Sequence, residues 1–145
     1  MNTPSPSSTT NQSAYPKTAA GAQAFVALYF ARVNEAWTRP QAGLITPLCA
    51  TSSKSCASVE QVARDLLSKG QKYDGPPVRL GSATVLGRFD PSSTEVVSQA
   101  LQERRNIVDA AGSVVSTDSQ KPVSNVFTIS WQESGWQIQK IEDVQ

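Results

Sequence analysis

The sequence VFTISWQESGWQIQKI, residues 126–141, decides the fold of this chain. Apolar and polar side chains alternate in both halves of the stretch, as they do in strands that bury one face. Glu133-Ser134-Gly135 lies between the halves, and this turn composition joins two antiparallel strands into a hairpin. We therefore predict strands over residues 123–132 and 135–143.

The preceding residues continue the same pattern. Val and Ile recur with a period of two after the turn-forming sequence DGPP at 74–77, which predicts strands over 78–89 and 94–109. The turn-forming sequence DPS at 90–92 separates these strands, and a turn over 111–121 leads to the hairpin. The C-terminal half is thus expected to be an antiparallel sheet of four or more strands.

The N-terminal half has helical periodicity instead. From the N-cap residue Thr18, apolar side chains recur at spacings of three and four until Pro40 ends the predicted helix. Ser58 and Gln61 have the spacing of a capping box for a second helix, which Gly70 ends. Helices followed by strands predict an α+β fold in which N-terminal helices cover one face of a curved antiparallel sheet.

Composition limits the domain count and the function. The chain has 145 residues, 39% hydrophobic and 17% charged, which suits one small domain, expected at 15–145. Its formal net charge of +1 gives no basic surface for nucleic acid. The sequence contains no histidine, which excludes a Ser-His-Asp or Cys-His nucleophile and histidine ligands for zinc or haem. We predict no cofactor and no metal site.

Residues 1–14 differ in composition from the rest. Beyond Met1 they contain no charged residue, no aromatic residue and no apolar residue larger than Ala or Pro. Such a stretch cannot bury enough surface to offset the entropy of ordering, so we predict a disordered polar linker. It lacks the basic and apolar regions of a signal peptide. No apolar run in the sequence is long enough to span a membrane.

Cys49 and Cys56 are the two cysteines of the sequence. Their spacing is too wide for a CxxC redox motif, and two cysteines alone are too few for a zinc site. A local disulfide would close a loop of about 8 residues and stabilise the fold by about 2.5 kcal/mol. It requires an oxidising compartment. The alternative is a pair of free buried thiols in a cytosolic protein.

Three stretches carry a resemblance: YPKTAAGAQAFVALYF at 15–30 with VNEA at 33–36, the Cys49 and Cys56 pair, and GWQI at 135–138. With the order of elements, they resemble the NTF2-like superfamily of cone-shaped, cystatin-like α+β domains, and more narrowly a family of uncharacterised actinobacterial surface lipoproteins. The resemblance implies an extracytoplasmic, cell-surface location. It also implies a lipid anchor on a cysteine upstream of Met1 that this sequence does not contain. It implies no established activity.

Glu103 is the candidate catalytic residue. The resemblance to enzymes of the ketosteroid-isomerase and polyketide-cyclase type implies an Asp or Glu that points into the apolar cone, where burial raises its pKa. On strand 94–109, the face with the larger apolar residues carries Glu103 and Arg105, and we expect that face to meet the helices. The alternative is that both side chains lie in solvent or neutralise each other at the rim.

The other acidic residues have contexts that favour structural roles. Glu35, Glu60 and Asp65 lie off the apolar stripes of the helices and are expected to be solvated. Asp74, Asp90 and Asp118 stand beside Gly, Pro or Ser, where Asp commonly bonds local backbone.

Aromatic side chains are the second lead. A set of them at inward spacing is usually core, but the wide end of a cone can stay open as an apolar pocket. The candidate ligand-binding residues are Tyr29, Trp37, Phe127, Trp131 and Trp136, together with Arg105.

Three hypotheses follow for the function. The first is a non-enzymatic binding module for a small apolar ligand or an envelope protein. The second is a carboxylate-dependent isomerase, dehydratase or cyclase that uses Glu103 as its base. The third is a structural module that dimerises through its sheet. We expect no nucleic-acid partner, contact with a membrane only through the upstream anchor, and a monomer or a homodimer.

Overall fold

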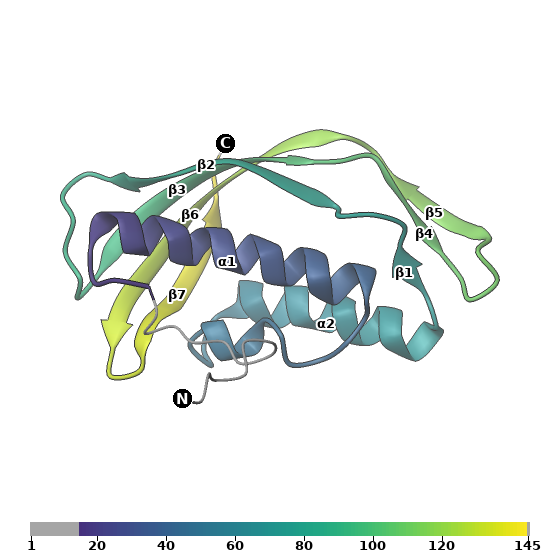
Figure 1. Cartoon of the computed structure of the whole chain (residues 1–145), viewed down its shortest axis with the longest axis horizontal. Coiled ribbons are helices and arrows are strands. Elements are labelled where there is room, and N and C mark those ends of the chain that lie inside the picture. The colour runs from purple at the N-terminus through teal and green to yellow at the C-terminus, as the bar shows by residue number, and fades with distance from the viewer. Residues whose placement is uncertain (1–14, 145) are drawn as a thin grey trace, which may run out of the picture.

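The computed structural model describes residues 15–144. The predicted linker over 1–14 and the terminal Gln145 lie outside the described residues. Two helices lie under one face of a curved antiparallel sheet, which arches over them (Figure 1). The α+β architecture expected from the sequence is therefore confirmed. No helix within 15–144 is long and apolar enough to cross a membrane.

The helices are α1 (Ala19–Thr38), the 3-10 turn η2 (Thr46–Leu48) and α2 (Lys54–Lys69). The side chain of Thr18 caps α1 as expected, because its Oγ1 accepts a hydrogen bond from the Gly21 N–H at 3.0 Å. The N-cap of α2 is Ser53, so the predicted start at Ser58 is wrong. The helix begins at Lys54, because the Ser53 hydroxyl accepts a hydrogen bond from the Cys56 N–H in the first turn. Gly70 ends α2 in the left-handed conformation, with a φ of +67°.

Seven strands follow in the described part of the chain: β1 (Lys72–Tyr73), β2 (Val78–Leu86), β3 (Thr94–Gln102), β4 (Arg105–Val108), β5 (Val114–Asp118), β6 (Lys121–Gln132) and β7 (Gly135–Asp143). All neighbouring strands pair antiparallel, in the orders β2-β3-β6-β7 and β1-β4-β5. The hairpin predicted from residues 126–141 is present as β6 and β7, with Trp131 opposite Trp136.

The strand expected over 94–109 is two strands, β3 and β4. The break falls at Glu103 and Arg104, where the chain leaves the four-stranded sheet and enters the three-stranded one. The region 111–121, expected to be a turn, contains β5. The Asp109 carboxylate accepts hydrogen bonds from the backbone of Ala111 and Ser113, and this tight turn lets β4 and β5 form a hairpin.

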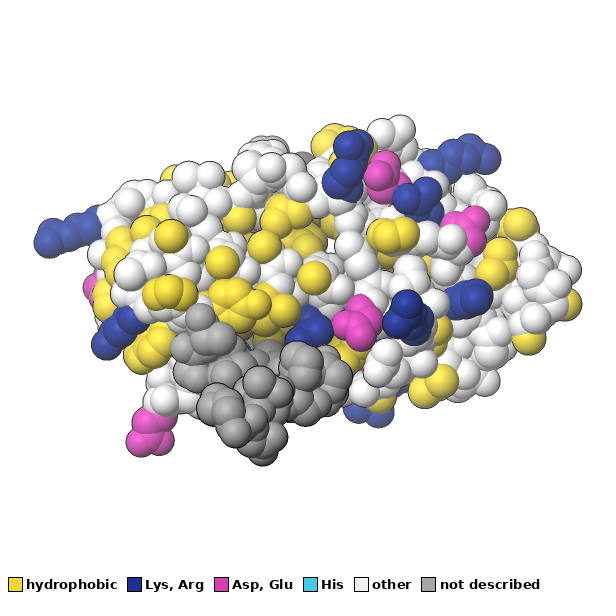
Figure 2. All heavy atoms as spheres, in the orientation of Figure 1, with side chains coloured by type: hydrophobic (Ala, Val, Ile, Leu, Met, Phe, Trp, Pro, Cys, Tyr) yellow, Lys and Arg dark blue, Asp and Glu magenta, His cyan; other side chains and the backbone are white. Residues whose placement is uncertain are grey.

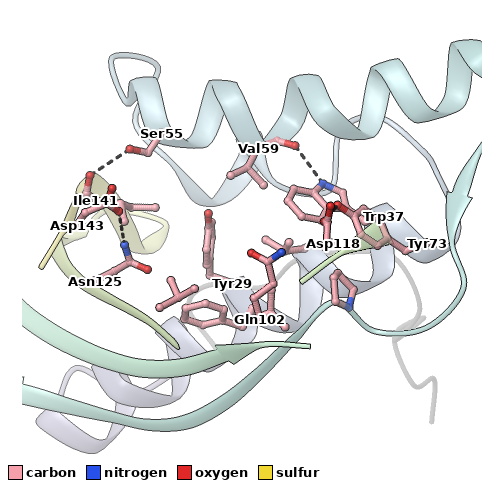
Figure 3. A pocket seen from close by; sticks show the side chains of 15 residues that line it. Tyr29, Trp37, Ser55, Val59, Tyr73, Gln102, Asp118, Asn125, Ile141 and Asp143 are labelled. Carbon is pink, nitrogen blue, oxygen red and sulfur yellow. Dashed lines mark hydrogen bonds between the residues drawn. The ribbon is translucent and has the colours of Figure 1, made fainter. Parts of the chain in front are cut away.

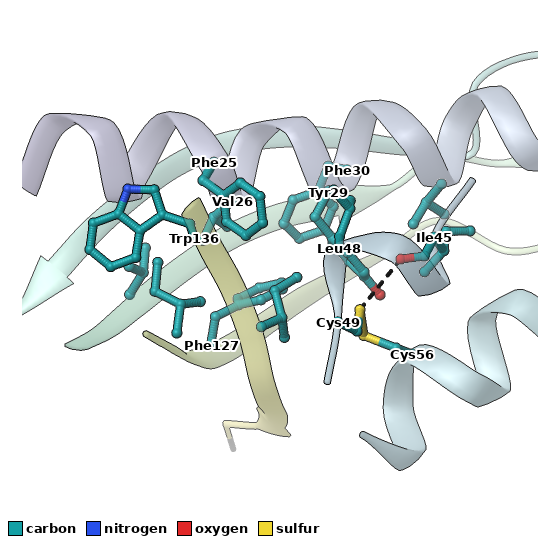
Figure 4. Packing of buried hydrophobic residues seen from close by; sticks show 14 of the residues in the cluster. Phe25, Val26, Tyr29, Phe30, Ile45, Leu48, Cys49, Cys56, Phe127 and Trp136 are labelled. Carbon is teal, nitrogen blue, oxygen red and sulfur yellow. Dashed lines mark hydrogen bonds between the residues drawn. A yellow bond between two sulfur atoms is a disulfide. The ribbon is translucent and has the colours of Figure 1, made fainter. Parts of the chain in front are cut away.

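The core lies between α1 and the concave face of the sheet (Figure 4). Phe25, Phe127 and Trp136 are fully buried in it. The Trp136 Nε1 donates a hydrogen bond to the Pro16 carbonyl at 2.9 Å. Gly21 allows this arrangement, because a Cβ there would overlap the Pro16 carbonyl oxygen. The N-terminal segment is thereby held against the last hairpin.

Asn34 ties α1 to the start of β2. Its amide nitrogen donates to the Val78 carbonyl at 2.8 Å, and its amide oxygen accepts from the Val78 N–H at 3.0 Å. A side chain amide that satisfies both backbone groups of one residue fixes that residue in two directions. Val78 lines the site described below, so Asn34 sets one of its walls.

Glu60 is not the solvated helix residue expected from the sequence, because its side chain is 4% exposed. Its carboxylate accepts hydrogen bonds from the backbone N–H of Gly43 at 2.6 Å, and of Ile45 and Thr46 at 3.4 Å each. Arg64 Nε lies 3.6 Å from it. The turn before η2 directs its N–H groups at α2, so an acidic side chain is needed there.

The expected disulfide joins Cys49, just after η2, to Cys56 in the first turn of α2 (Figure 4). Both residues are buried. The disulfide and Glu60 therefore fix α2 to the preceding loop at two separate points. A disulfide of this kind is typical of proteins in an oxidising compartment.

Candidate functional site

A cavity of about 330 Å³ lies between the two helices and the concave face of the sheet (Figure 3). Its apolar wall is formed by side chains from both helices and three strands: Phe30, Val33, Val59, Val78, Val123 and Ile141. Its polar groups are contributed by Tyr29, Ser55, Gln102, Asp118, Asn125 and Asp143. An apolar cavity with a few convergent polar groups is the usual form of a small-molecule site.

Tyr29 stands in the middle of the cavity, with its hydroxyl pointing toward α2 (Figure 3). The residue is 5% exposed. Its ring packs edge-to-face on Phe127 at 5.1 Å between centroids, which fixes its direction. Burial raises the pKa of the Tyr29 phenol far above its ordinary value of 10.0, so the hydroxyl stays protonated. No hydrogen bond joins this hydroxyl to any described residue.

At one end of the cavity, Trp37, Tyr73 and Asp118 form a connected group (Figure 3). The Trp37 and Tyr73 rings are stacked, with centroids 5.5 Å apart and 16° between planes. The Trp37 Nε1 donates to the Val59 carbonyl at 3.2 Å. The Tyr73 hydroxyl donates to Asp118 Oδ2 at 2.6 Å. Burial, and then the Asp118 carboxylate, raise the pKa of the Tyr73 phenol.

At the other end, Asn125 and Asp143 form a second polar pair. The Asn125 amide donates to Asp143 Oδ1 at 2.9 Å, between β6 and β7. Beside them, the Ser55 hydroxyl of α2 donates to the Ile141 carbonyl at 3.1 Å. Asp143 is exposed, so this end of the cavity reaches solvent.

Of the residues predicted from the sequence, Tyr29 and Trp37 line the cavity, whereas Glu103 and Arg105 do not. Glu103 Oε2 lies 3.2 Å from Arg79 Nε on the neighbouring strand. Arg105 Nε donates to the Pro76 carbonyl at 2.9 Å. Gln102 points into the cavity, so Glu103, the next residue along the chain, does not share its face.

The face of β3 expected to meet the helices is the wrong one. Val96 and Ser98 are fully buried, whereas Glu95 and Gln99 are exposed. The sequence analysis chose the face of this strand that carries the larger apolar side chains. In the structure, the face against the aromatic-rich core carries Ser98 and Ala100, because large side chains from α1 already fill that space.

The remaining aromatic candidates lie outside the cavity. Phe127 and Trp136 belong to the buried core. Trp131 packs edge-to-face on Trp136, at 5.3 Å between centroids. The Lys17 ammonium lies 5.8 Å from the centroid of the Trp131 ring. The two tryptophan rings close the end of the fold where the hairpin turns.

Sequence reasoning named Tyr29 and Trp37 and missed the other residues that line the cavity, among them Tyr73, Gln102, Asp118, Asn125 and Asp143. Asp118 was expected to bond its local backbone in a turn, but its carboxylate reaches across to Tyr73. A usable signal exists for Asn125. It shares the inward face of β6 with the buried Phe127 and Ile129, and a polar residue on such a face indicates a site.

Charge is sparse around this fold. Within residues 15–144, no group of three or more Cys, Asp or Glu side chains is arranged to hold a metal ion. On the face shown in Figure 2, Lys, Arg, Asp and Glu side chains are scattered among neutral ones.

Comparisons with known proteins show the fold. No family model and no curated protein matches the sequence. The crystal structure of the intermembrane space region of the chloroplast protein ARC6 is similar, with a TM-score of 0.60 and 15% identity over 88% of this chain and 96% of that chain. The structure of Aln2 from a Streptomyces species has a TM-score of 0.52 and 14% identity, over 83% of this chain and 88% of that chain.

A domain of unknown function with a cystatin-like fold, from Nostoc punctiforme, has a TM-score of 0.47 and 18% identity over 85% of this chain and 76% of that chain. Likenesses at these identities show the fold alone. The chain shares its α+β fold with the ARC6 region and with Aln2, and the NTF2-like superfamily stays what the resemblance in the sequence implies. The narrower likeness to actinobacterial lipoproteins stays a prediction.

Proposed function

We propose that this chain is a binding domain for a small, largely apolar molecule, which occupies the cavity between the helices and the sheet. The observation that carries the proposal is the Tyr29 hydroxyl, which a largely buried side chain directs into the cavity and which makes no hydrogen bond to any described residue. It is therefore free to bind one polar group of a ligand whose apolar part occupies the rest of the cavity.

The size and chemistry of the cavity support the same function. At about 330 Å³ it is at the lower end of the range for ligand sites, which suits a short alkyl chain or a single ring system. Val33, Val123 and Ile141 offer such a molecule aliphatic contacts. The polar groups are few and stand at defined points, so they orient a ligand rather than solvate the whole of it.

The geometry does not favour catalysis by Glu103. An enzyme of the expected type needs its base in the cavity, within reach of the proton that it removes. The Glu103 carboxylate instead pairs with Arg79 away from the cavity. Glu103 is therefore not expected to contribute to the binding of a ligand in the cavity.

The disulfide supports an extracytoplasmic location for this binding domain, since such bonds persist in oxidising compartments. The similar ARC6 region is an intermembrane space region. We further propose the lipid anchor implied by the resemblance, with residues 1–14 as the tether.

Isothermal titration calorimetry with octan-1-ol tests the proposal. We expect saturable binding to the wild-type chain and its loss in Val123→Phe, because a phenyl ring there fills the cavity. Val114→Phe is the matched control: Val114 is 58% exposed on β5, outside the cavity, and the variant should bind as the wild type does.

Glu103→Gln separates binding from the catalytic alternative. This variant should bind octan-1-ol with unchanged affinity, because Glu103 does not line the cavity. Absence of saturable heat with the wild type, or equal binding by Val123→Phe, would refute the proposed function.

A further inference from the structure

The cavity has acidic side chains but no basic ones among the residues that line it. Asp118 and Asp143 stand at its two ends, and no Lys or Arg shares the wall. Neither carboxylate forms an ion pair with a described residue. The cavity therefore presents two carboxylates that no ion pair among the described residues neutralises.

Asp118 is the better placed of the two for contact with a ligand. It is half-buried, and the Tyr73 hydroxyl holds one of its oxygens at 2.6 Å. Arg105 lies opposite Asp118 in the β4–β5 register, but its Nε donates to the Pro76 carbonyl instead. The second carboxylate oxygen of Asp118 makes no hydrogen bond to a described residue.

Aromatic rings stand beside this carboxylate. Trp37 and Tyr73 are stacked on each other at the same end of the cavity, and Tyr29 follows toward its middle (Figure 3). The faces of such rings attract cations through their quadrupoles, most strongly when water is excluded. A carboxylate flanked by aromatic rings is thus a combination that recognises an ammonium group.

We propose that the ligand of this cavity is a small apolar molecule that carries an ammonium group, which Asp118 binds beside the Trp37 and Tyr73 rings. This inference rests on the proposed function, since it specifies the class of ligand for the same cavity. The neutral Tyr29 hydroxyl then meets a second polar group of the ligand, and Val33 and Val123 contact its apolar part. An anion of equal size, such as a fatty acid, is repelled.

Three probes with the same chain and different head groups test the proposal: octylammonium, octan-1-ol and octanoate. In calorimetry at neutral pH and low salt, octylammonium should bind about tenfold more tightly than octan-1-ol, and octanoate should bind least. Raising the salt concentration should weaken the binding of octylammonium and leave the binding of octan-1-ol unchanged, because salt screens only the charged contact. The salt series needs no variant, so it does not depend on the folding of one.

Asp118→Asn assigns the head-group preference to a residue. The amide keeps an acceptor for the Tyr73 hydroxyl but removes the charge, so octylammonium should fall to the affinity of octan-1-ol. Asp65→Asn is the matched control, because Asp65 is exposed on α2 and outside the cavity. It changes the net charge of the protein equally and should keep the preference.

The outcomes distinguish this inference from the proposed function. If octan-1-ol binds as tightly as octylammonium, or octanoate binds best, the inference fails while the apolar binding function stands. If the preference persists unchanged in Asp118→Asn, the assignment to Asp118 fails. If none of the three probes binds, the proposed function itself fails.

Discussion

Replacing Glu60 by alanine removes the acceptor of three backbone N–H groups in the loop between α1 and α2. The three donors are Gly43 at 2.6 Å, and Ile45 and Thr46 at 3.4 Å each, and the Glu60 side chain is 4% exposed. Ile45 is fully buried in the native fold, so its N–H depends on the Glu60 carboxylate for a hydrogen-bond partner. The loop then loses one of its two attachments to α2.

The magnitude follows from these three bonds. The short bond from Gly43 to a charged acceptor contributes about 2 kcal/mol, and the two long bonds together contribute about 1 kcal/mol. Arg64 adds little, because it is 55% exposed. Glu60→Ala should therefore lower the free energy of unfolding by about 3 kcal/mol, which is about 10 °C in Tm for a domain of this size. Glu60→Gln keeps one acceptor oxygen and should lose about half as much.

Urea and thermal unfolding, followed by circular dichroism, measure both variants. Glu35→Ala is the control, because this glutamate also lies near an arginine, with Arg32 Nη1 at 3.2 Å, but it is 40% exposed and accepts no backbone N–H of a described residue through its carboxylate. Glu35→Ala should lower the free energy of unfolding by less than about 1 kcal/mol. A loss below about 1 kcal/mol for Glu60→Ala, or an equal loss for Glu60→Ala and Glu35→Ala, would refute the role given to Glu60.

Three further predictions concern the disulfide, Asn34 and Tyr29. Reduction, or Cys49→Ser with Cys56→Ser, should cost about 2.5 kcal/mol in urea unfolding and preserve the far-UV spectrum; no loss would contradict the entropic account of the loop. Asn34→Ala should cost about 2 kcal/mol in the same assay, because both of its bonds to Val78 are lost, and a neutral result would remove Asn34 as the positioner of β2. Above pH 10.0, the unfolded chain ionises its tyrosines while Tyr29 stays protonated in the fold. The unfolded state then binds fewer protons, so stability should fall by about 1.4 kcal/mol per pH unit from this residue, and Tyr29→Phe should show a shallower slope in alkaline unfolding; equal slopes would contradict the burial of this phenol.

The last hairpin and the first helix were predictable from the sequence, because each buries one face and so carries a clean period. The strand break at Glu103 and Arg104 was not, since alternation continues across it and only the change of pairing partner marks it. Glu60 was misjudged for a similar reason. A charged residue off the apolar stripe is usually solvated, and only the path of the loop over 43–46 brings three N–H groups to it.

An open apolar pocket was the alternative to a filled aromatic core, and two of the residues that line the cavity, Tyr29 and Trp37, were named from the sequence. Tyr29 and Trp37 were found because the face of α1 that they occupy points inward in any α+β arrangement of this order. Asp118 lies on β5, whose position over the helices depends on the β4–β5 hairpin, and Asn125 depends on the register of β6. The strand pairing places Asp118 and Asn125 at the same cavity, so their spacing in the sequence and the composition do not predict that they line one site.

The most direct test of the central claim is the methyl NMR spectrum of the chain during titration with octan-1-ol. Val33, Val123 and Ile141 line the cavity, whereas Val96 and Ile129 are buried in the core outside it. We predict saturable shifts of the first three methyl sets with little change in the other two. Unchanged cavity methyl signals at high ligand concentration, or shifts confined to exposed residues such as Val114, would contradict the claim that this fold holds a ligand between its helices and its sheet.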